Sequence, residues 1–285
     1  MTIDEHAKRT PDKKAVIMEQ GGASLSYAEL DERSERIARQ LRTFLGEGDR
    51  VGILLENSPA CYEVSWAARR CGLRWVPINW HLRGAEVAYV AADSDARALI
   101  SSPALAEVAR ETAANTPSLE ACFSTGEPFD QFSSLREAIK SPNLPDYGSA
   151  NEGIYMFYSS GTTGHPKGIL RPLPGAPFGT PLPVEHLMQG HYGFDESTVF
   201  YSPGPLYHAA PLGWTIGAQL FGGTVISADR FDAERALATI EKYRVTHAQF
   251  VPTHLTRMLK LPREVREKYD CSSLEMVVHA AAPCP

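Results

Sequence analysis

The chain has 285 residues, of which 43% are hydrophobic and 22% are charged, a balance that is ordinary for a soluble globular protein with one or two buried cores. Its net charge of −6 argues against nucleic acid as a partner, because binding a phosphate backbone requires an excess of Lys and Arg. The 5 cysteines are scattered without C-x-x-C spacing, which excludes a zinc site or disulfide framework of the usual pattern and predicts free thiols.

The N-terminus has no apolar signal-peptide core, and the sequence has no run of about 18 apolar residues that could span a membrane. We therefore expect a cytoplasmic protein without a transmembrane segment.

Apolar strands alternate with helices along the first part of the chain. Strands are predicted at 15–18, 50–55, 73–79, 96–101 and 119–123, and helices at 26–45, 58–71, 84–92 and 104–115. Ser26 and Glu29 form a capping box at the start of the first helix, whose charged face we expect to be solvated. Continuously apolar strands separated by helices indicate a parallel sheet that is covered on both faces.

The middle of the chain is less regular. Residues 127–151 are rich in Pro, Ser and Asp and predict a connector with a short helix near 135–139. Residues 171–183 contain five prolines, which exclude a helix or a central strand and leave either a mobile flank or an exposed surface excursion. The alternation then resumes, with strands predicted at 198–202, 224–227, 246–251 and 276–278 and helices near 209–221, 233–243 and 252–269.

One run stands out, from Tyr158 to Gly168, which reads Tyr-Ser-Ser-Gly-Thr-Thr-Gly-His-Pro-Lys-Gly and follows an apolar strand predicted at 153–158. Its glycines permit positive φ angles, its hydroxyl and N–H groups donate hydrogen bonds, and Lys167 adds a positive charge, so the run suits a polyphosphate. The alternative interpretation is a solvated loop. The run is not a Walker loop, because two residues separate its first two glycines and its lysine is followed by Gly.

This run closely resembles the phosphate loop of the adenylate-forming, or AMP-binding, superfamily, which includes acyl-CoA synthetases, aryl-CoA ligases, luciferases and the adenylation domains of peptide synthetases. Residues 25–30 (Leu-Ser-Tyr-Ala-Glu-Leu) and 71–79 (Cys-Gly-Leu-Arg-Trp-Val-Pro-Ile-Asn) are similar to earlier motifs of the same superfamily. The resemblance covers essentially the whole chain and is strongest to a fatty acyl-CoA synthetase.

The resemblance implies an α/β fold with two stacked αβα-type subdomains and largely parallel sheets, as in the N-terminal large domain of an adenylate-forming enzyme. We expect the first subdomain with its connector at 1–150, and the second, which begins with the phosphate loop, at 151–285. The superfamily's later motifs and its C-terminal lysine-bearing domain are not found in the sequence, so a truncated domain is implied. An incomplete sheet leaves an unpaired edge, and we expect self-association into a homo-oligomer.

The resemblance also implies that ATP and Mg²⁺ bind at the run. Lys167 is expected to stabilise the leaving pyrophosphate, and the Ser159 hydroxyl to share the Mg²⁺. The residues expected to hold the β- and γ-phosphates are Ser159, Ser160, Gly161, Thr162, Thr163, Gly164 and Lys167. Near the end of the chain Ala281, Ala282 and Pro283 are expected to pack against adenine, and His279 and Ala280 stand where serine and glycine are common in the superfamily.

A second constellation is Tyr207-His208, ahead of an uncharged segment that starts at Leu212. A histidine between an aromatic residue and two alanines is by itself more often a packed or surface residue. The resemblance instead implies that His208, Tyr207 and Leu212 line the acyl pocket and that His208 orients the substrate. A carboxylate is already ionised at neutral pH, so His208 is not expected to act as a general base.

The function implied is that of an ATP-dependent acid–thiol ligase, an acyl-CoA synthetase that adenylates a fatty or related carboxylic acid and passes the acyl group to CoA. The chain alone is expected to be inactive, because the ribose and lysine anchors of the superfamily are not found in it. Two alternatives stay open. One is a fatty acyl-AMP ligase that loads a carrier protein, and the other is a non-catalytic short form that binds a nucleotide or a protein partner.

Overall fold

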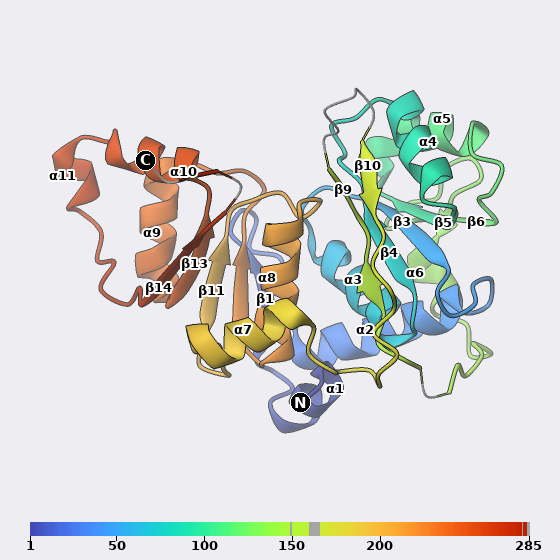
Figure 1. The fold of residues 1–285 in the computed structure, drawn as a ribbon, viewed down its shortest axis with the longest axis horizontal. Helices are drawn as coiled ribbons and strands as arrows, with labels where there is room; N and C mark the ends of the chain where they lie inside the picture. The colour runs from blue at the N-terminus through green and yellow to red at the C-terminus, as the bar shows by residue number, and fades with distance from the viewer. Residues whose placement is uncertain (149, 160–165, 281, 284–285) are drawn as a thin grey trace. The chain divides into compact units, whose positions relative to one another are not determined.

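The computed structural model of the chain describes residues 1–148, 150–159, 166–280 and 282–283 (Figure 1). The chain divides into two compact units, of which unit 1 contains Met1–Leu30 and Pro181–Pro285 and unit 2 contains Asp31–Thr180. This division differs from the boundary expected at residue 150. The N-terminal residues join the later part of the chain because strand β1 (Lys14–Met18) pairs in parallel with β12 (Thr224–Ser227).

Unit 2 is built on a sheet of six parallel strands, counted over the residues that the structure describes, in the order β7-β6-β5-β3-β4-β8. These strands are β3 (Arg50–Leu54), β4 (Arg74–Pro77), β5 (Ala96–Ser101), β6 (Ala121–Ser124), β7 (Ser133–Ser134) and β8 (Ile154–Tyr155). The helices are α2 (Tyr27–Leu41), which begins in unit 1, α3 (Pro59–Arg70), α4 (Gly84–Asp93), the 3₁₀ turn η1 (Pro103–Leu105), α5 (Ala106–Ala114) and α6 (Leu135–Ala138).

The core of unit 2 follows from its apolar strands. Side chains from β3, β4 and β5 pack with those of α4 and α5 in one cluster, whose buried members include Leu54, Val76, Val87, Leu99, Ala109 and Met156. On burial the aliphatic side chains each contribute about 1.5–3 kcal/mol, so this cluster is a main source of the unit's stability.

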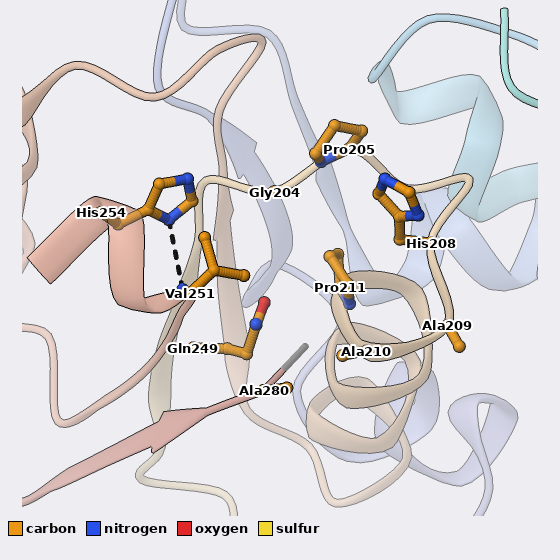
Figure 2. A pocket seen from close by; sticks show the side chains of 10 residues that line it. All are labelled: Gly204, Pro205, His208, Ala209, Ala210, Pro211, Gln249, Val251, His254 and Ala280. Atoms are coloured by element: carbon orange, nitrogen blue, oxygen red, sulfur yellow. Dashed lines mark hydrogen bonds between the residues drawn. The ribbon is translucent and has the colours of Figure 1, made fainter. Parts of the chain in front are cut away.

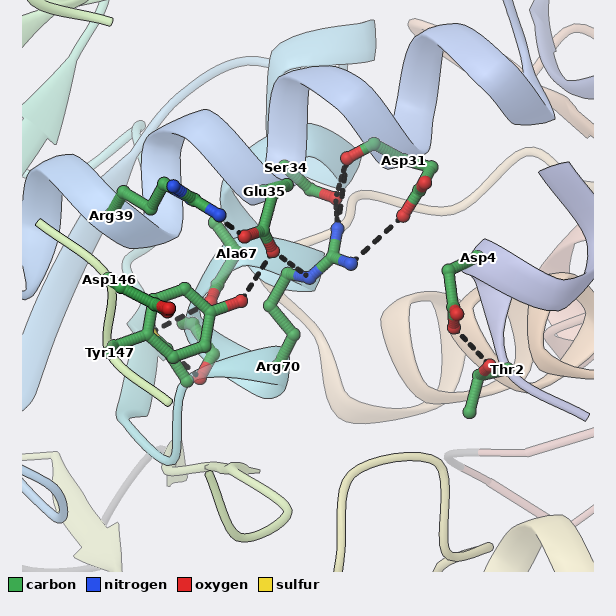
Figure 3. A network of polar contacts seen from close by, with 12 residues as sticks. Thr2, Asp4, Asp31, Ser34, Glu35, Arg39, Ala67, Arg70, Asp146 and Tyr147 are labelled. Carbon is green, nitrogen blue, oxygen red and sulfur yellow. Dashed lines mark hydrogen bonds and ion pairs between the residues drawn. The ribbon is translucent and has the colours of Figure 1, made fainter. Parts of the chain in front are cut away.

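The charged face of α2 is not fully solvated, contrary to expectation. Arg70, at the end of α3, is 8% exposed and pairs with two acids of α2, its Nη2 with Asp31 Oδ1 at 2.9 Å and its Nε with Glu35 Oε2 at 3.1 Å (Figure 3). Glu35 also accepts hydrogen bonds from Arg39 Nε at 2.9 Å and from the Tyr147 hydroxyl at 2.5 Å. The polar face of α2 therefore fastens this helix to α3.

Unit 1 contains a second six-stranded sheet among its described residues, in the order β14-β13-β11-β12-β1-β2, parallel except for β2. Its remaining strands are β2 (Ser24–Ser26), β11 (Val199–Ser202), β13 (His247–Phe250) and β14 (Met276–His279). Its helices are α1 (Ile3–Arg9), α7 (Pro183–Tyr192), α8 (Ala209–Leu220), α9 (Ala233–Tyr243), α10 (Pro252–Leu259) and α11 (Arg263–Arg266). Helix α8 packs against β11, β12 and β13, and α7 packs against α8.

The α/β class and the largely parallel sheets are as expected from the sequence, and the capping box is confirmed. The Ser26 N–H donates to Glu29 Oε2 at 2.7 Å, and the Glu29 N–H donates to Ser26 Oγ at 3.2 Å. Helices α1 and α7 were not predicted. Among the helices of the described part of the chain, none is both long and apolar enough to cross a membrane.

Candidate active site

The ends of the predicted phosphate loop form a two-stranded antiparallel hairpin in unit 2. Strand β9 (Phe157–Ser159) pairs with β10 (Lys167–Ile169), and Ser159 lies opposite Lys167. The single strand predicted at 153–158 is therefore wrong: β8 belongs to the large sheet of unit 2, whereas β9 belongs to this hairpin. The strand partner therefore changes between β8 and β9, and this change separates the loop from the six-stranded sheet of unit 2.

Ser159 and Lys167 both have exposed side chains, and the Ser159 hydroxyl donates to the Lys167 carbonyl at 3.5 Å. The lysine ammonium and the serine oxygen are thus available to a ligand at the end of the hairpin that is next to the loop. Five residues that are expected to hold phosphate lie outside the described residues, namely Ser160, Gly161, Thr162, Thr163 and Gly164.

The proline-rich segment after the hairpin is exposed over most of residues 171–177, but contacts of Ala176 and Phe178 hold its later part against unit 2. The Phe178 ring contacts the ring of buried Trp66 edge to face, with centroids 6.2 Å apart, and the Arg70 guanidinium lies 5.5 Å from the Phe178 ring centroid. The Glu152 N–H donates to the Ala176 carbonyl at 2.7 Å. These contacts fix the chain that leaves the hairpin.

A pocket of about 440 Å³ lies in unit 1 (Figure 2). It opens where β11, β13 and β14 end, at the carboxyl edge of the parallel sheet, which is where α/β proteins usually bind ligands. The lining residues come from the turn into α8 and the first turn of that helix, from the ends of β13 and β14, and from α10. They are Gly204, Pro205, His208, Ala209, Ala210, Pro211, Gln249, Val251, His254 and Ala280.

Gly204 sets the close turn beside the pocket. A Cβ atom at this position would lie 2.6 Å from Pro211 Cγ, so a side chain there would push the two segments apart. Apart from two histidines and Gln249, the lining consists of glycine, alanine, proline and valine, and the pocket therefore has small, largely apolar walls.

His208 lines this pocket. It is the N-cap residue of α8, and its backbone N–H donates to the Pro205 carbonyl at 3.1 Å. The ring is open to solvent on one side, while loss of hydration against the pocket wall lowers its pKa and favours the neutral imidazole. Tyr207 lies against His208, with ring centroids 4.5 Å apart. In the described part of the chain neither Tyr207 nor the buried Leu212 is among the lining residues.

Two polar lining residues, Gln249 and His254, were missed by the sequence analysis. Gln249 is 2% exposed, and its Nε2 donates to the Phe250 carbonyl at 3.2 Å. The His254 ring stacks on Phe231, with centroids 4.0 Å apart, and its Nδ1 accepts the Val251 N–H at 3.5 Å. The available signal was the amide side chain of Gln249 beside the apolar residues Ala248, Phe250 and Val251.

The imidazole of His254 is neutral at physiological pH. Burial, and after it the positive charge of Arg257, lower the pKa of His254 to about 4. Since Nδ1 accepts a hydrogen bond, the ring proton lies on Nε2, which is a donor. Figure 2 shows the Gln249 side chain and the His254 ring on the pocket side of their elements.

The predicted adenine segment follows β14. Ala280 lines the pocket and its N–H donates to the Phe250 carbonyl at 3.3 Å. Ala282 and Pro283 are exposed, and Ala281 lies outside the described residues. The start of the segment is therefore next to the acyl-pocket candidate in unit 1.

The described residues contain no group of three or more His, Cys, Asp or Glu that could hold a metal ion. The candidate metal ligand in the hairpin is the hydroxyl oxygen of Ser159. It suits Mg²⁺ that arrives with nucleotide phosphates, because this ion prefers oxygen ligands and binds few protein groups.

Known proteins match this chain over nearly its whole length. The model of the family "AMP-binding enzyme" matches residues 3–285. The chain is 33% identical over 285 residues to a feruloyl-CoA synthase of Amycolatopsis sp, and 30% identical over 286 residues to the fatty acid–[acyl-carrier-protein] ligase ScoC of Streptomyces coeruleorubidus. These matches cover 98% and 99% of this chain but 53% of each relative, so the chain spans about half the length of the curated relatives it matches.

The fold is also that of a solved structure, the inhibitor-bound N-terminal domain of FACL13 from Mycobacterium tuberculosis. The TM-score is 0.80 at 24% identity, and the match covers 99% of this chain and 69% of that chain. The family match over almost every residue shows that the chain belongs to the AMP-binding enzyme family of adenylate-forming ligases.

Proposed function

We propose that the chain forms the ATP- and acid-binding part of an AMP-forming acid–thiol ligase. In this reaction a carboxylate oxygen attacks the α-phosphorus of ATP, pyrophosphate leaves, and a thiol then displaces AMP from the acyl group. The observation that carries the proposal is the run Tyr158–Gly168, with Lys167 exposed at the foot of the hairpin, in a member of the AMP-binding enzyme family.

The roles proposed for the residues follow from charge. Both reactants are anions, so the protein has to neutralise the leaving group and align the attacking oxygen. Lys167 stabilises the pyrophosphate, Ser159 shares the Mg²⁺ that ATP brings, and the hydroxyl and N–H groups of residues 160–164 bind the β- and γ-phosphates. His208, with the Tyr207 ring packed against it, orients the carboxylate, and residues 281–283 contact adenine.

The thiol acceptor proposed is CoA. The match to the feruloyl-CoA synthase of Amycolatopsis sp supports CoA, whereas the match to ScoC, which is named for an acyl-carrier-protein, supports the alternative of a carrier protein. Transfer of a radiolabelled acyl group to free CoA, compared with transfer to a phosphopantetheinylated carrier protein, distinguishes the two.

For the acid we retain a fatty acid as one candidate, and the pocket supports a second, an acid that carries a hydroxyl group. Gln249 Oε1 can accept a hydrogen bond from the hydroxyl group, and the Nε2–H of neutral His254 can donate one to the hydroxyl oxygen. A buried polar group that is left unpaired costs about 1–3 kcal/mol, so such a pocket discriminates against an acid without the hydroxyl.

The test is acid-dependent ATP–pyrophosphate exchange by the protein produced from its complete reading frame. The panel contains hexadecanoic acid, ferulic acid and the matching cinnamic acid that lacks the phenolic hydroxyl. Preference for ferulic over the deoxygenated acid, reduced about ten-fold in Gln249→Leu, supports the hydroxy acid. Preference for hexadecanoic acid supports the fatty acid, and nucleotide binding without exchange on any acid supports the non-catalytic alternative.

A further inference from the structure

The chain on each side of residues 160–165 makes a hydrogen bond to one helix, α4. The Tyr158 hydroxyl, in β9, donates to Asp93 Oδ2 of α4 at 2.6 Å. The Tyr89 hydroxyl, also of α4, donates at 3.2 Å to the carbonyl of Pro166, the residue directly before β10. One hydrogen bond therefore lies at each side of the hairpin.

The geometry of α4 accounts for this pairing. Tyr89 and Asp93 are four residues apart, so their side chains lie one above the other on the same face of the helix. Tyr89 and Tyr158 also pack against the buried cluster that contains Val87, and Val87 comes from α4 itself. The two hydroxyl groups thus extend from rings that the core of unit 2 holds in place.

Gly168 allows the tyrosine ring to reach the helix. Tyr158 and Gly168 are opposite each other in the hairpin, and a Cβ atom on Gly168 would lie 3.0 Å from Cζ of Tyr158 and 3.1 Å from its hydroxyl oxygen. The missing side chain leaves the space through which the Tyr158 ring crosses its partner strand. The same Cβ atom would lie 2.5 Å from Met156 Cε, so a larger residue at 168 would crowd both Met156 and the Tyr158 ring.

We propose that Tyr89, Asp93 and Tyr158 are positioning residues for adenylation, which fix the hairpin so that Lys167 and Ser159 face the phosphates of ATP. This inference rests on the proposed function. Lys167 follows Pro166 directly, and Ser159 follows Tyr158 directly, so each bond to α4 lies one residue from a group that is assigned to ATP. None of the three positioning residues needs to touch the nucleotide.

The first test is a double-mutant cycle in the protein made from its complete reading frame, read as ATP–pyrophosphate exchange. Tyr158→Phe and Asp93→Ala each raise KM for ATP about two- to ten-fold, which corresponds to the loss of one hydrogen bond. Both variants leave KM for the acid unchanged. The double variant is no worse than either single variant, because both remove the same bond. Asp93→Asn keeps an oxygen acceptor and stays within about two-fold of the unsubstituted protein.

Tyr147→Phe is the matched control. Its hydroxyl also donates to a carboxylate in unit 2, that of Glu35, but in the polar contacts between α2 and α3 (Figure 3). It should leave both KM values unchanged. Equal changes in the control and in Tyr158→Phe, or additive losses in the double variant, overturn the proposal.

The second test does not depend on activity. Hydrogen exchange of the amides in β9 and β10 is measured on the 285-residue chain without nucleotide, and Tyr158→Phe and Tyr89→Phe each accelerate it about two- to ten-fold. Unchanged exchange in both variants overturns the positioning role. Absence of acid-dependent pyrophosphate exchange in the unsubstituted protein instead counts against the proposed function, and the hydrogen-exchange result still decides on the positioning residues.

Discussion

Arg69 and Glu152 form an ion pair in which both side chains are 0% exposed. The second carboxylate oxygen of Glu152 accepts the Gly179 N–H at 2.6 Å, and the Arg69 carbonyl accepts the Gly153 N–H at 2.8 Å. The guanidinium also lies 4.9 Å from the ring centroid of Trp66. One buried pair therefore connects α3 with the chain before the hairpin and with the proline-rich segment after it.

Replacing Glu152 by Ala should destabilise unit 2 by about 3–5 kcal/mol, because it leaves the Arg69 charge buried without its carboxylate. The measurement is the midpoint of urea unfolding of the 285-residue chain, monitored through spectroscopic signals of residues in unit 2. The matched control is Glu137→Ala, which removes an exposed partner of Lys140 in the same unit and should cost about 1 kcal/mol or less. Similar losses in both variants would show that burial of the pair is energetically unimportant.

Replacing Lys167 by Ala should lower the adenylation rate about 10²-fold and leave the affinity for the acid nearly unchanged, because the lysine is assigned to the leaving group. Single-turnover pyrophosphate release, with acid and ATP varied separately, gives the two parameters. Lys140→Ala, an exposed lysine elsewhere in unit 2, is the control. An equal loss in rate and in acid affinity would contradict the role in leaving-group stabilisation.

Replacing His208 by Ala should raise KM for the acid about ten-fold, with a smaller effect on KM for ATP, because the ring lines the pocket in unit 1. The pH profile of exchange should keep its shape, since a carboxylate nucleophile needs no general base. His208→Phe, which keeps a ring of similar size, should recover part of the affinity. Loss of the acidic limb of the profile in His208→Ala would instead identify the histidine as a base.

The stability of unit 1 should fall as the pH is lowered from about 6.5 to 4, partly because of His254. Its pKa in the folded chain is depressed to about 4, so between these values the unfolded state binds a proton that the folded state does not. The contribution of His254 is thus fully present above pH 6.5 and is lost as the pH falls towards 4.

The measurement for His254 is hydrogen exchange of the β13 amides at several pH values, compared with a His254→Gln variant. The variant should show a weaker loss of protection over the same interval. His6, whose pKa is also lowered by burial, remains in both proteins, so the difference between them isolates His254. Identical pH dependence in the two proteins would count against this assignment.

Much of the fold could be predicted from local patterns. The strand at 96–101 and the helix at 233–243 have the expected limits, because an apolar run between turn signals and an amphipathic stretch behind an Asp cap are decided by neighbouring residues. The split between β8 and β9 could not be predicted, because partners from distant parts of the chain decide it. The same holds for the pairing of β1 with β12, which places residues 1–30 in unit 1.

The site was predicted unevenly for a similar reason. His208 is preceded by an aromatic residue in a recognisable segment, and the structure has it at a pocket. Gln249 and His254 carry no motif, and only the packing of β13 and α10 brings them to the same cavity. Tyr89 and Asp93 read as ordinary helix residues until the hairpin is seen beside them.

The pairing of β1 with β12 has a consequence for how the protein is made. Lys13 donates to the carbonyl of Gly222 at 2.6 Å, and these residues are 209 positions apart. At a synthesis rate of about 5–20 residues per second, about 10–40 s pass between the synthesis of β1 and that of its partner strand β12. Unit 2 is contiguous from Asp31 to Thr180 and can fold in that interval. During this interval β1 can pair with β2 on one edge, while its other edge stays without its partner strand.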